Sequence, residues 1–477
     1  MAKTKRRTAG RLNSRLHQAP TLRPSGQAKS HPNISYPLTG AETFAAAISR
    51  LHVRRDQNSS DRHDLEFDGF ILELLCTVMQ PVADMAQPTR LDAQNCVMGY
   101  RMKNIELVTD TLRAAPLDLP PSLREVVEYR KSGLSLNHVV GCPLDCGYCV
   151  RHLFDNYDMK RPHLVMDDAT AVQTLMGHWA FRRHTTPIQI FNRATDPMLP
   201  RVKEHLHRTL ELLDGYGLTN PVLVITRWRV DREDVERFER LSNLKLTVLV
   251  TWSGIADKRI EPVDSTIAEM SLATLASGAH RTKRILYWRP VVAGLNDDDH
   301  LISRARELAQ LADATVFTGL FHREEIRAYL RSVGVPDLYN TAPRRKIMPR
   351  SIEKSILAKF TDMPIFRKTS CAVAFAHGIA DYNGHLGIEH ICDICPPDQV
   401  RICTDAYVRP SQERIDELAA EAGLRSDMVE IRPGRILVSD STEQQRYFIQ
   451  HATGFQVHDR AHPHLPGRHG RAEEGWE

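Results

Sequence analysis

The chain has 477 residues, of which 42% are hydrophobic and 26% charged, and its formal net charge is +4. This composition is typical of a globular protein with more than one structural unit. No run approaches the ~18 apolar residues that cross a bilayer, and no apolar segment follows the basic N-terminus, so we expect a cytoplasmic protein without membrane spans or a secretory signal. Seven of the nine cysteines fall in two tight clusters, which favours metal binding over a disulfide framework.

Residues 1–37 are predicted to form a disordered basic arm. Eight Lys or Arg residues occur before residue 30, and the first acidic residue is Glu42. Such an arm either contacts the phosphate backbone of DNA or RNA or acts as a solubilising tail, and the sequence leaves both interpretations open. Residues 38–131 have apolar residues at helical spacing and are predicted to form a helical N-terminal extension, which includes a short helix over 123–129 after Pro120-Pro121-Ser122.

Residues 132–322 alternate between predicted strands and helices. The predicted strands are 136–140, 188–192, 222–226, 244–251, 284–290 and 314–319. The predicted helices between them are 168–182, 203–216, 231–241, 267–277 and 298–311. Six β/α units in succession predict an α/β fold in which a parallel sheet curves into a partial (β/α)6 barrel. In such folds the reacting groups lie at the carboxyl ends of the strands.

Three cysteines follow the first predicted strand in the pattern C-x3-C-x2-C, at Cys142, Cys146 and Cys149. A four-iron cluster takes four protein ligands, so three thiolates leave one iron open to chelation by a small molecule. The alternatives are a zinc knuckle, which usually pairs C-x2-C units, or three unrelated core cysteines. The spacing favours the open cluster.

This triplet resembles the radical S-adenosylmethionine (SAM) superfamily, and residues 134–320 resemble its spore photoproduct lyase branch. The further matching stretches are Asn192-Arg-Ala-Thr-Asp-Pro197, Thr226-Arg227, Glu261-Pro262, Arg289-Pro290 and Gly294-Leu-Asn-Asp297. The resemblance implies that the triplet holds a [4Fe-4S] cluster and that an electron from it cleaves bound SAM to a 5′-deoxyadenosyl radical. It also implies an electron donor such as flavodoxin or ferredoxin.

The same resemblance implies several contacts to SAM. Tyr148 occupies the position beside the last ligand where the backbone meets the adenine, and Arg227 takes the place of a residue that contacts the SAM carboxylate. Asn192, Thr195 and Asp196 would lie near the methionine group, and Ser253 would contact the ribose. Thr195 and Asp196 also suit a simple helix cap before Pro197.

One feature departs from the spore photoproduct lyase pattern. Those enzymes use a cysteine hydrogen donor between the triplet and the later strands, whereas no cysteine occurs here from Val150 through Ser370. The resemblance therefore implies radical generation but not the repair reaction. Tyr157 and Tyr216 are the alternative hydrogen donors that the sequence offers.

A second cysteine group lies in a predicted C-terminal extension, residues 323–410. Cys371, Cys392, Cys395 and Cys403 read C-x20-C-x2-C-x7-C, and four thiolates can hold zinc or an auxiliary [4Fe-4S] cluster. One of the histidines between them could replace a cysteine; these are His377, His385 and His390. Residues 411–477 are predicted to form a small α+β unit, with a helix over 411–423 and a hairpin of 428–431 and 435–438, followed by a tail.

The sequence therefore predicts a radical SAM enzyme that acts on nucleic acid in repair or modification. The basic arm supports this substrate, as do Arg151, Lys160 and Arg161 beside the cysteine loop. One alternative is radical modification of a peptide or small metabolite. Another is a metal-dependent nucleic-acid-binding protein without catalytic activity.

Deletion of residues 1–34 tests the arm, because it removes eight cations. If the arm binds phosphates, the deletion should weaken oligonucleotide binding. It should also reduce the slope of log affinity against log salt concentration by about 0.7–0.9 for each phosphate that is no longer neutralised. Fluorescence anisotropy over a salt series measures this slope. A slope equal to that of the full chain would identify the segment as a passive tail.

Overall fold

The structure is a computed structural model that describes residues 112–116, 118–154, 156–340 and 346–461. The predicted basic arm and most of the predicted helical extension lie outside these residues, and the predicted domain boundaries stay predictions. Within the described part of the chain, no helix has the length and apolar character needed to cross a membrane.

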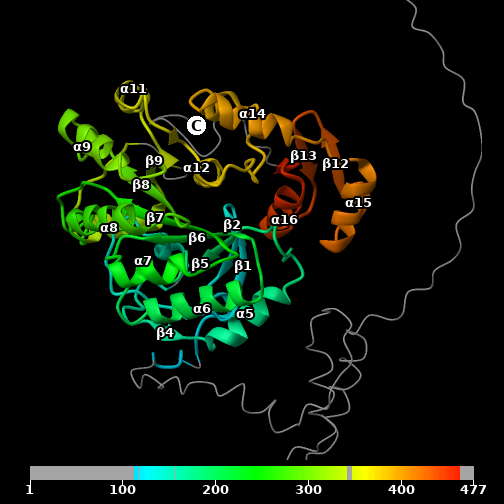
Figure 1. Ribbon diagram of the computed structural model, residues 1–477, viewed down its shortest axis with the longest axis horizontal. Coiled ribbons are helices and arrows are strands. Elements are labelled where there is room, and N and C mark those ends of the chain that lie inside the picture. Colours follow the sequence, from blue (N-terminus) through cyan, green and yellow to red (C-terminus); the bar gives the residue numbers. More distant parts are fainter. Residues whose placement is uncertain (1–111, 117, 155, 341–345, 462–477) are drawn as a thin grey trace, which may run out of the picture. The chain divides into compact units, whose positions relative to one another are not determined.

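Six parallel strands form the centre of one sheet (Figure 1). In spatial order they are β2 (Gly133–Leu136), β5 (Ile188–Ile190), β6 (Pro221–Thr226), β7 (Lys245–Trp252), β8 (Lys283–Val291) and β9 (Ala314–Phe321). Short strands complete the edges: β1 (Val127–Arg130) is antiparallel to β2, β10 (Lys346–Ile347) is antiparallel to β9, and β11 (Ile365–Phe366) is parallel to β9. The fold is therefore α/β with a parallel sheet, as predicted.

The start of the sheet differs from the prediction in two places. The helix expected over 123–129 ends early as α4 (Pro121–Arg124), because residues 127–130 alternate between buried and half-buried positions and pair with β2 as an edge strand. The strand expected over 136–140 is divided. β2 ends at Leu136, and β3 (Val139–Val140) pairs instead with β4 (His163–Leu164), since the backbone N–H of Asn137 turns to the Val126 carbonyl at 2.7 Å.

The helices between the parallel strands pack on the outer face of the sheet. They are α5 (Asp168–Met176), α6 (Lys203–Gly215), α7 (Arg232–Glu239), α8 (Ser265–Gly278) and α9 (Asp299–Ala309). Asp167 caps α5 by accepting from the Thr170 N–H at 2.9 Å, and Asp298 caps α9 in the same way from Leu301 at 2.9 Å. Val222, Val224 and Val248 share one core cluster with these helices.

The inner face of the sheet is divided into a filled part and an open part. Leu223, Leu249 and Ile285 alternate with the outward valines and pack against α12 (Thr369–Ala376). The next inward positions toward the carboxyl ends of the strands line a cavity instead: Ile225, Thr251, Tyr287 and Thr318. The cavity therefore lies at the carboxyl ends of the parallel strands, where the sequence places the functional residues.

The remaining chain adds helices and a separate three-stranded sheet. The helices are α10 (Glu324–Ser332), α11 (Arg350–Lys359), α13 (Glu389–Cys392), α14 (Pro397–Asp405), α15 (Gln412–Glu421) and α16 (Glu443–Thr453). The small sheet has the order β12 (Val429–Arg432), β13 (Arg435–Val438), β14 (Gln456–Asp459). The predicted helix 411–423 and hairpin are present as α15, β12 and β13. α16 and β14 were not predicted, and they occupy part of the expected tail.

Candidate active site

The three cysteines of the loop line one cavity of about 890 Å³. Cys142 and Cys146 are buried and Cys149 is half-buried. The loop begins at Gly141, whose φ of +98° is a left-handed conformation; a Cβ there would lie 2.2 Å from the Arg161 carbonyl oxygen. Glycine is therefore required where the chain turns into the loop.

Arg151 holds this loop from within. Its side chain is buried, and its guanidinium donates to the carbonyl oxygens of Cys142 at 3.1 Å, Leu144 at 3.0 Å, Asn156 at 3.1 Å and Tyr157 at 3.3 Å. A guanidinium carries five N–H donors in a fixed plane and can join several stretches of backbone at once. Arg151 is buried and both of its terminal nitrogens bond to backbone carbonyls inside the protein, so in this structure it gives no support to a nucleic-acid substrate.

The two other cations beside the loop differ from Arg151. Lys160 forms an ion pair with Asp145 at 2.7 Å, and its ammonium lies 3.6 Å from the centre of the Tyr157 ring. Arg161 is exposed. Of the three cations that the sequence associated with nucleic acid, Arg161 is thus the one at the surface with no ion pair among the described residues.

Tyr148, Arg227 and Glu261 form a buried hydrogen-bonded group. The Tyr148 hydroxyl bonds to a Glu261 carboxylate oxygen and accepts from Arg227 Nη1, and Arg227 Nη1 lies 3.3 Å from Glu261 Oε2. Burial raises the pKa of Tyr148 well above its usual range. Three separate motif stretches of the sequence therefore meet at one point, beside the last cysteine.

Asp196 joins the ends of two strands. Its carboxylate accepts from Thr226 Oγ1 at 2.6 Å, from the Arg227 backbone N–H at 2.9 Å and from the Met198 N–H at 3.0 Å. The last of these bonds is a cap within its own segment, and the first two tie the loop after β5 to the end of β6. Neighbouring Thr195 lines the cavity, and its buried hydroxyl has no hydrogen-bond partner among the described residues.

Asn192 lines the cavity, but Ser253 does not. The Asn192 side chain bonds to Gln189 Oε1 at 2.6 Å and Ser135 Oγ at 3.1 Å. Ser253 is buried, and its hydroxyl accepts from the Ile255 N–H at 3.2 Å. Two residues earlier, Thr251 does face the cavity, and its hydroxyl has no partner among the described residues; the inward alternation along β7 is the signal that could have identified it.

The aromatic residues around the cavity also differ from the expectation. Neither Tyr157 nor Tyr216 lines it: Tyr157 stacks on His152 with ring centres 3.6 Å apart, and Tyr216 is exposed. Tyr287 on β8 does line the cavity, and its hydroxyl lies 3.1 Å from Thr369 Oγ1. Among the described tyrosines, Tyr148 and Tyr287 are therefore the ones that a ligand in the cavity would contact.

The second cysteine group is arranged differently from the predicted four-thiol set. Ligand atoms of Cys371, Asp381 and His385 lie within 4.8 Å of one another and are buried. His385 Nδ1 is 3.7 Å from Cys371 Sγ and 3.0 Å from Asp381 Oδ2. Of the three histidines considered, His385 therefore joins the group, whereas His377 Nε2 bonds to Thr247 Oγ1 at 2.8 Å.

The other three cysteines surround this group. Cys392 Sγ is 3.3 Å from the His385 carbonyl, and Cys403 Sγ accepts from the Asp381 N–H at 3.4 Å. Burial, with the nearby Cys392 and Cys403, raises the pKa of Cys395 to about 12. The four thiols lie in one region, but the tight group that the structure brings together contains one thiol, one carboxylate and one imidazole.

Replacing Arg151 tests its role in the loop. Arg151→Met leaves buried carbonyls without their charged donor, and we expect it to lower the free energy of unfolding by about 3 kcal/mol. Urea denaturation measures this loss. Lys160→Met is the matched control, because a surface ion pair contributes about 0.5 kcal/mol; equal losses in the two variants would contradict the assignment.

The chain has neighbours of low similarity among solved structures. No family model and no curated protein matches the chain. Among solved structures, it is similar to a mutant of spore photoproduct lyase, with 10% identity over 52% of this chain and 80% of that one and a TM-score of 0.40.

A second neighbour is Streptococcus suis SuiB bound to S-adenosylmethionine, with 7% identity over 53% of this chain and 54% of that one and a TM-score of 0.35. A third is the radical S-adenosylmethionine methyltransferase TsrM from Kitasatospora setae, with 15% identity over 41% of this chain and 37% of that one and a TM-score of 0.29. Since every one of these TM-scores is below 0.5, they do not decide its function.

Proposed function

We propose that this chain is a radical SAM enzyme built on a partial (β/α)6 barrel. The observation that carries the proposal is the position of Cys142, Cys146 and Cys149, which come from one short loop and line one cavity at the carboxyl ends of parallel strands. The hydroxyls of Thr195 and Thr251 support it. They line the same cavity, are buried and have no hydrogen-bond partner among the described residues. Buried polar groups are normally hydrogen-bonded, so these hydroxyls suit contacts with a polar ligand.

The donor set suits an iron–sulfur cluster better than a single ion. A tetrahedral zinc ion with bonds of about 2.3 Å to sulfur needs sulfur atoms about 3.8 Å apart. Among the described residues, the sulfur atoms of the three loop cysteines are not all within 4.8 Å of one another. Wider spacing fits a [4Fe-4S] cluster, in which each cysteine binds a different iron.

When bound, the cluster and SAM supply an electron and a 5′-deoxyadenosyl radical. The protein positions SAM and excludes water. Arg227 lines the cavity and is held through Nη1 by Tyr148 and Glu261, and a guanidinium suits a carboxylate ligand. Asp196 stabilises the same strand ends through its bonds to Thr226 and to the Arg227 backbone.

Nucleic acid is the substrate class that we propose, with flavodoxin or ferredoxin as the type of electron donor. The charge of residues 1–37 supports this substrate, and exposed Arg161 near the loop adds to it. The photoproduct repair reaction itself is not proposed. The cysteines among the described lining residues are those of the triplet, so this lining offers no separate thiol that could donate a hydrogen atom.

The triplet is tested by single substitutions. Cys142→Ala, Cys146→Ala and Cys149→Ala should each abolish formation of 5′-deoxyadenosine, because loss of one thiolate destroys the open-iron cluster. The assay is anaerobic reconstitution, reduction and chromatography of the products. Cys76→Ala is the matched control, since Cys76 belongs to neither cysteine group. Wild-type product from any single triplet variant would refute the proposal.

We also propose a second metal site at Cys371, Asp381 and His385. Three buried ligand atoms within 4.8 Å suit one ion such as zinc more closely than an auxiliary [4Fe-4S] cluster. Cys392, Cys395 and Cys403 lie beside the group, and one of them would complete the coordination.

A variant with all three triplet cysteines changed to alanine should still retain about one zinc per chain, by elemental analysis. Adding His385→Ala in that background should remove the zinc. About four irons per chain in the triplet variant would instead identify an auxiliary cluster. Retention of neither metal would assign these cysteines to the core.

A further inference from the structure

The cavity is strongly basic. Nine Lys or Arg residues line it, against two carboxylates, Asp196 and Glu353. Asp196 already accepts three hydrogen bonds, and Glu353 pairs with Arg367 at 2.6 Å. The residues that line the cavity therefore carry a large net positive charge.

Most of these cations are held by other protein groups. Arg193 pairs with Glu128 at 2.5 Å, Arg130 with Glu128 at 3.3 Å and Arg227 with Glu261 at 3.3 Å. Arg151 is bonded to the cysteine loop, and Lys368 also has an interaction within the chain. The exceptions are Lys131, Arg289 and Lys346, which have no carboxylate within 4.0 Å in the described ranges.

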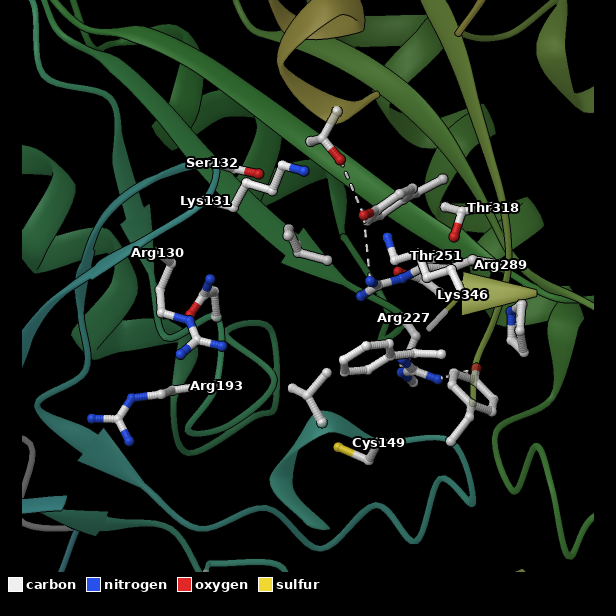
Figure 2. A pocket seen from close by; sticks show the side chains of 18 of the residues that line it. Arg130, Lys131, Ser132, Cys149, Arg193, Arg227, Thr251, Arg289, Thr318 and Lys346 are labelled. Carbon is white, nitrogen blue, oxygen red and sulfur yellow. Dashed lines mark hydrogen bonds between the residues drawn. The ribbon is translucent and has the colours of Figure 1, made fainter. Parts of the chain in front are cut away.

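These three cations come from separate parts of the fold and meet at one place. Lys131 lies in the turn between β1 and β2, Arg289 on β8 and Lys346 on β10. In Figure 2, Lys131 extends into the cavity from one side, and Arg289 and Lys346 from the other. Burial and the nearby Lys346 lower the pKa of Lys131 to about 8, and burial and Arg289 lower that of Lys346. The positive charges of Lys346 and Lys131, and of Arg289 and Lys346, therefore repel each other.

Arg289 is oriented rather than mobile. Its guanidinium lies 4.1 Å from the centre of the Tyr287 ring, and Nη1 donates to the Tyr287 hydroxyl at 3.3 Å. The buried Nε has no hydrogen-bond partner among the described residues. A fixed guanidinium with an unused donor is prepared to bind an oxyanion.

We propose that Lys131, Arg289 and Lys346 bind a phosphate group of the substrate. The three side chains are half-buried, and none forms an ion pair in the described ranges, although Asp381 and Glu443 act on Lys131 from beyond 4.0 Å. An anionic ligand balances the remaining positive charge. Phosphate fits better than a carboxylate, because its charge of up to about −2 and its several acceptor oxygens match three separate cations. Calling the ligand a substrate rests on the proposed function. The site adds to that function a substrate phosphate that reaches the inner wall of the cavity.

The test measures binding without catalysis. The reconstituted protein is titrated calorimetrically, at fixed ionic strength, with a nucleoside 5′-monophosphate, a dinucleoside monophosphate that carries only a diester, and the bare nucleoside. Each is measured for the wild type, Lys346→Met and Arg289→Met, with Lys160→Met as a control cation outside the cavity. Stronger binding of the monoester would indicate a small phosphorylated substrate, and stronger binding of the diester would indicate a nucleic-acid strand.

We expect the preferred phosphate compound to bind the wild type and Lys160→Met equally, and each cavity variant at least about tenfold more weakly. Lys346→Met should unfold at no lower temperature than the wild type without ligand, since it removes a half-buried cation that has no ion pair among the described residues. Affinity independent of both cavity residues, or no preference over the bare nucleoside, would overturn the phosphate site. Phosphate binding that depends on these residues, together with no 5′-deoxyadenosine from SAM, would retain the site and refute the proposed function instead.

Discussion

The inner face of the parallel sheet must be covered, and the way this chain covers it determines the rest of the structure. Helix α12 fills the part lined by Leu223, Leu249 and Ile285 and leaves the carboxyl ends of the strands open. Because the carboxyl ends of parallel strands meet at one edge of the sheet, residues from many loops line this open part. Cys371, on the same helix, thereby belongs to the core cluster on the inner face of the sheet.

The cations that line the cavity are of two kinds. Arg151 and Arg227 are bonded to backbone carbonyls or to Tyr148 and Glu261, and they stabilise the loops that carry the cysteines and the strand ends. Lys131 and Lys346 form no comparable ion pairs among the described residues, and burial lowers their pKa. The first kind fixes geometry, and the second leaves a positive potential that a ligand can neutralise. The same residue types thus divide into structural and binding roles according to their partners.

Local patterns allowed much of this fold to be predicted. Strands 222–226 and 244–251 and their helices follow from periodicity and caps, which depend on near neighbours in sequence. The triplet was found because all three ligands lie within eight residues. Contacts between distant segments were missed or misjudged. Arg151 looks like a surface cation until the carbonyls around it are placed, and Asp381 joins Cys371 and His385 only in space.

The turn that carries Lys131 depends on the far end of the described chain. Helix α16 packs on β1, where Gln444 Oε1 accepts from the Tyr129 N–H at 3.0 Å, and His451 Nε2 lies 3.2 Å from the Lys131 carbonyl. The parallel strands and their outer helices can associate as soon as they leave the ribosome. The basic wall acquires its final form only after α16 has been synthesised. During translation, a nascent chain would therefore contain its cysteine loop well before α16 completes the wall of the cavity, and ligand capture would wait until α16 has been made.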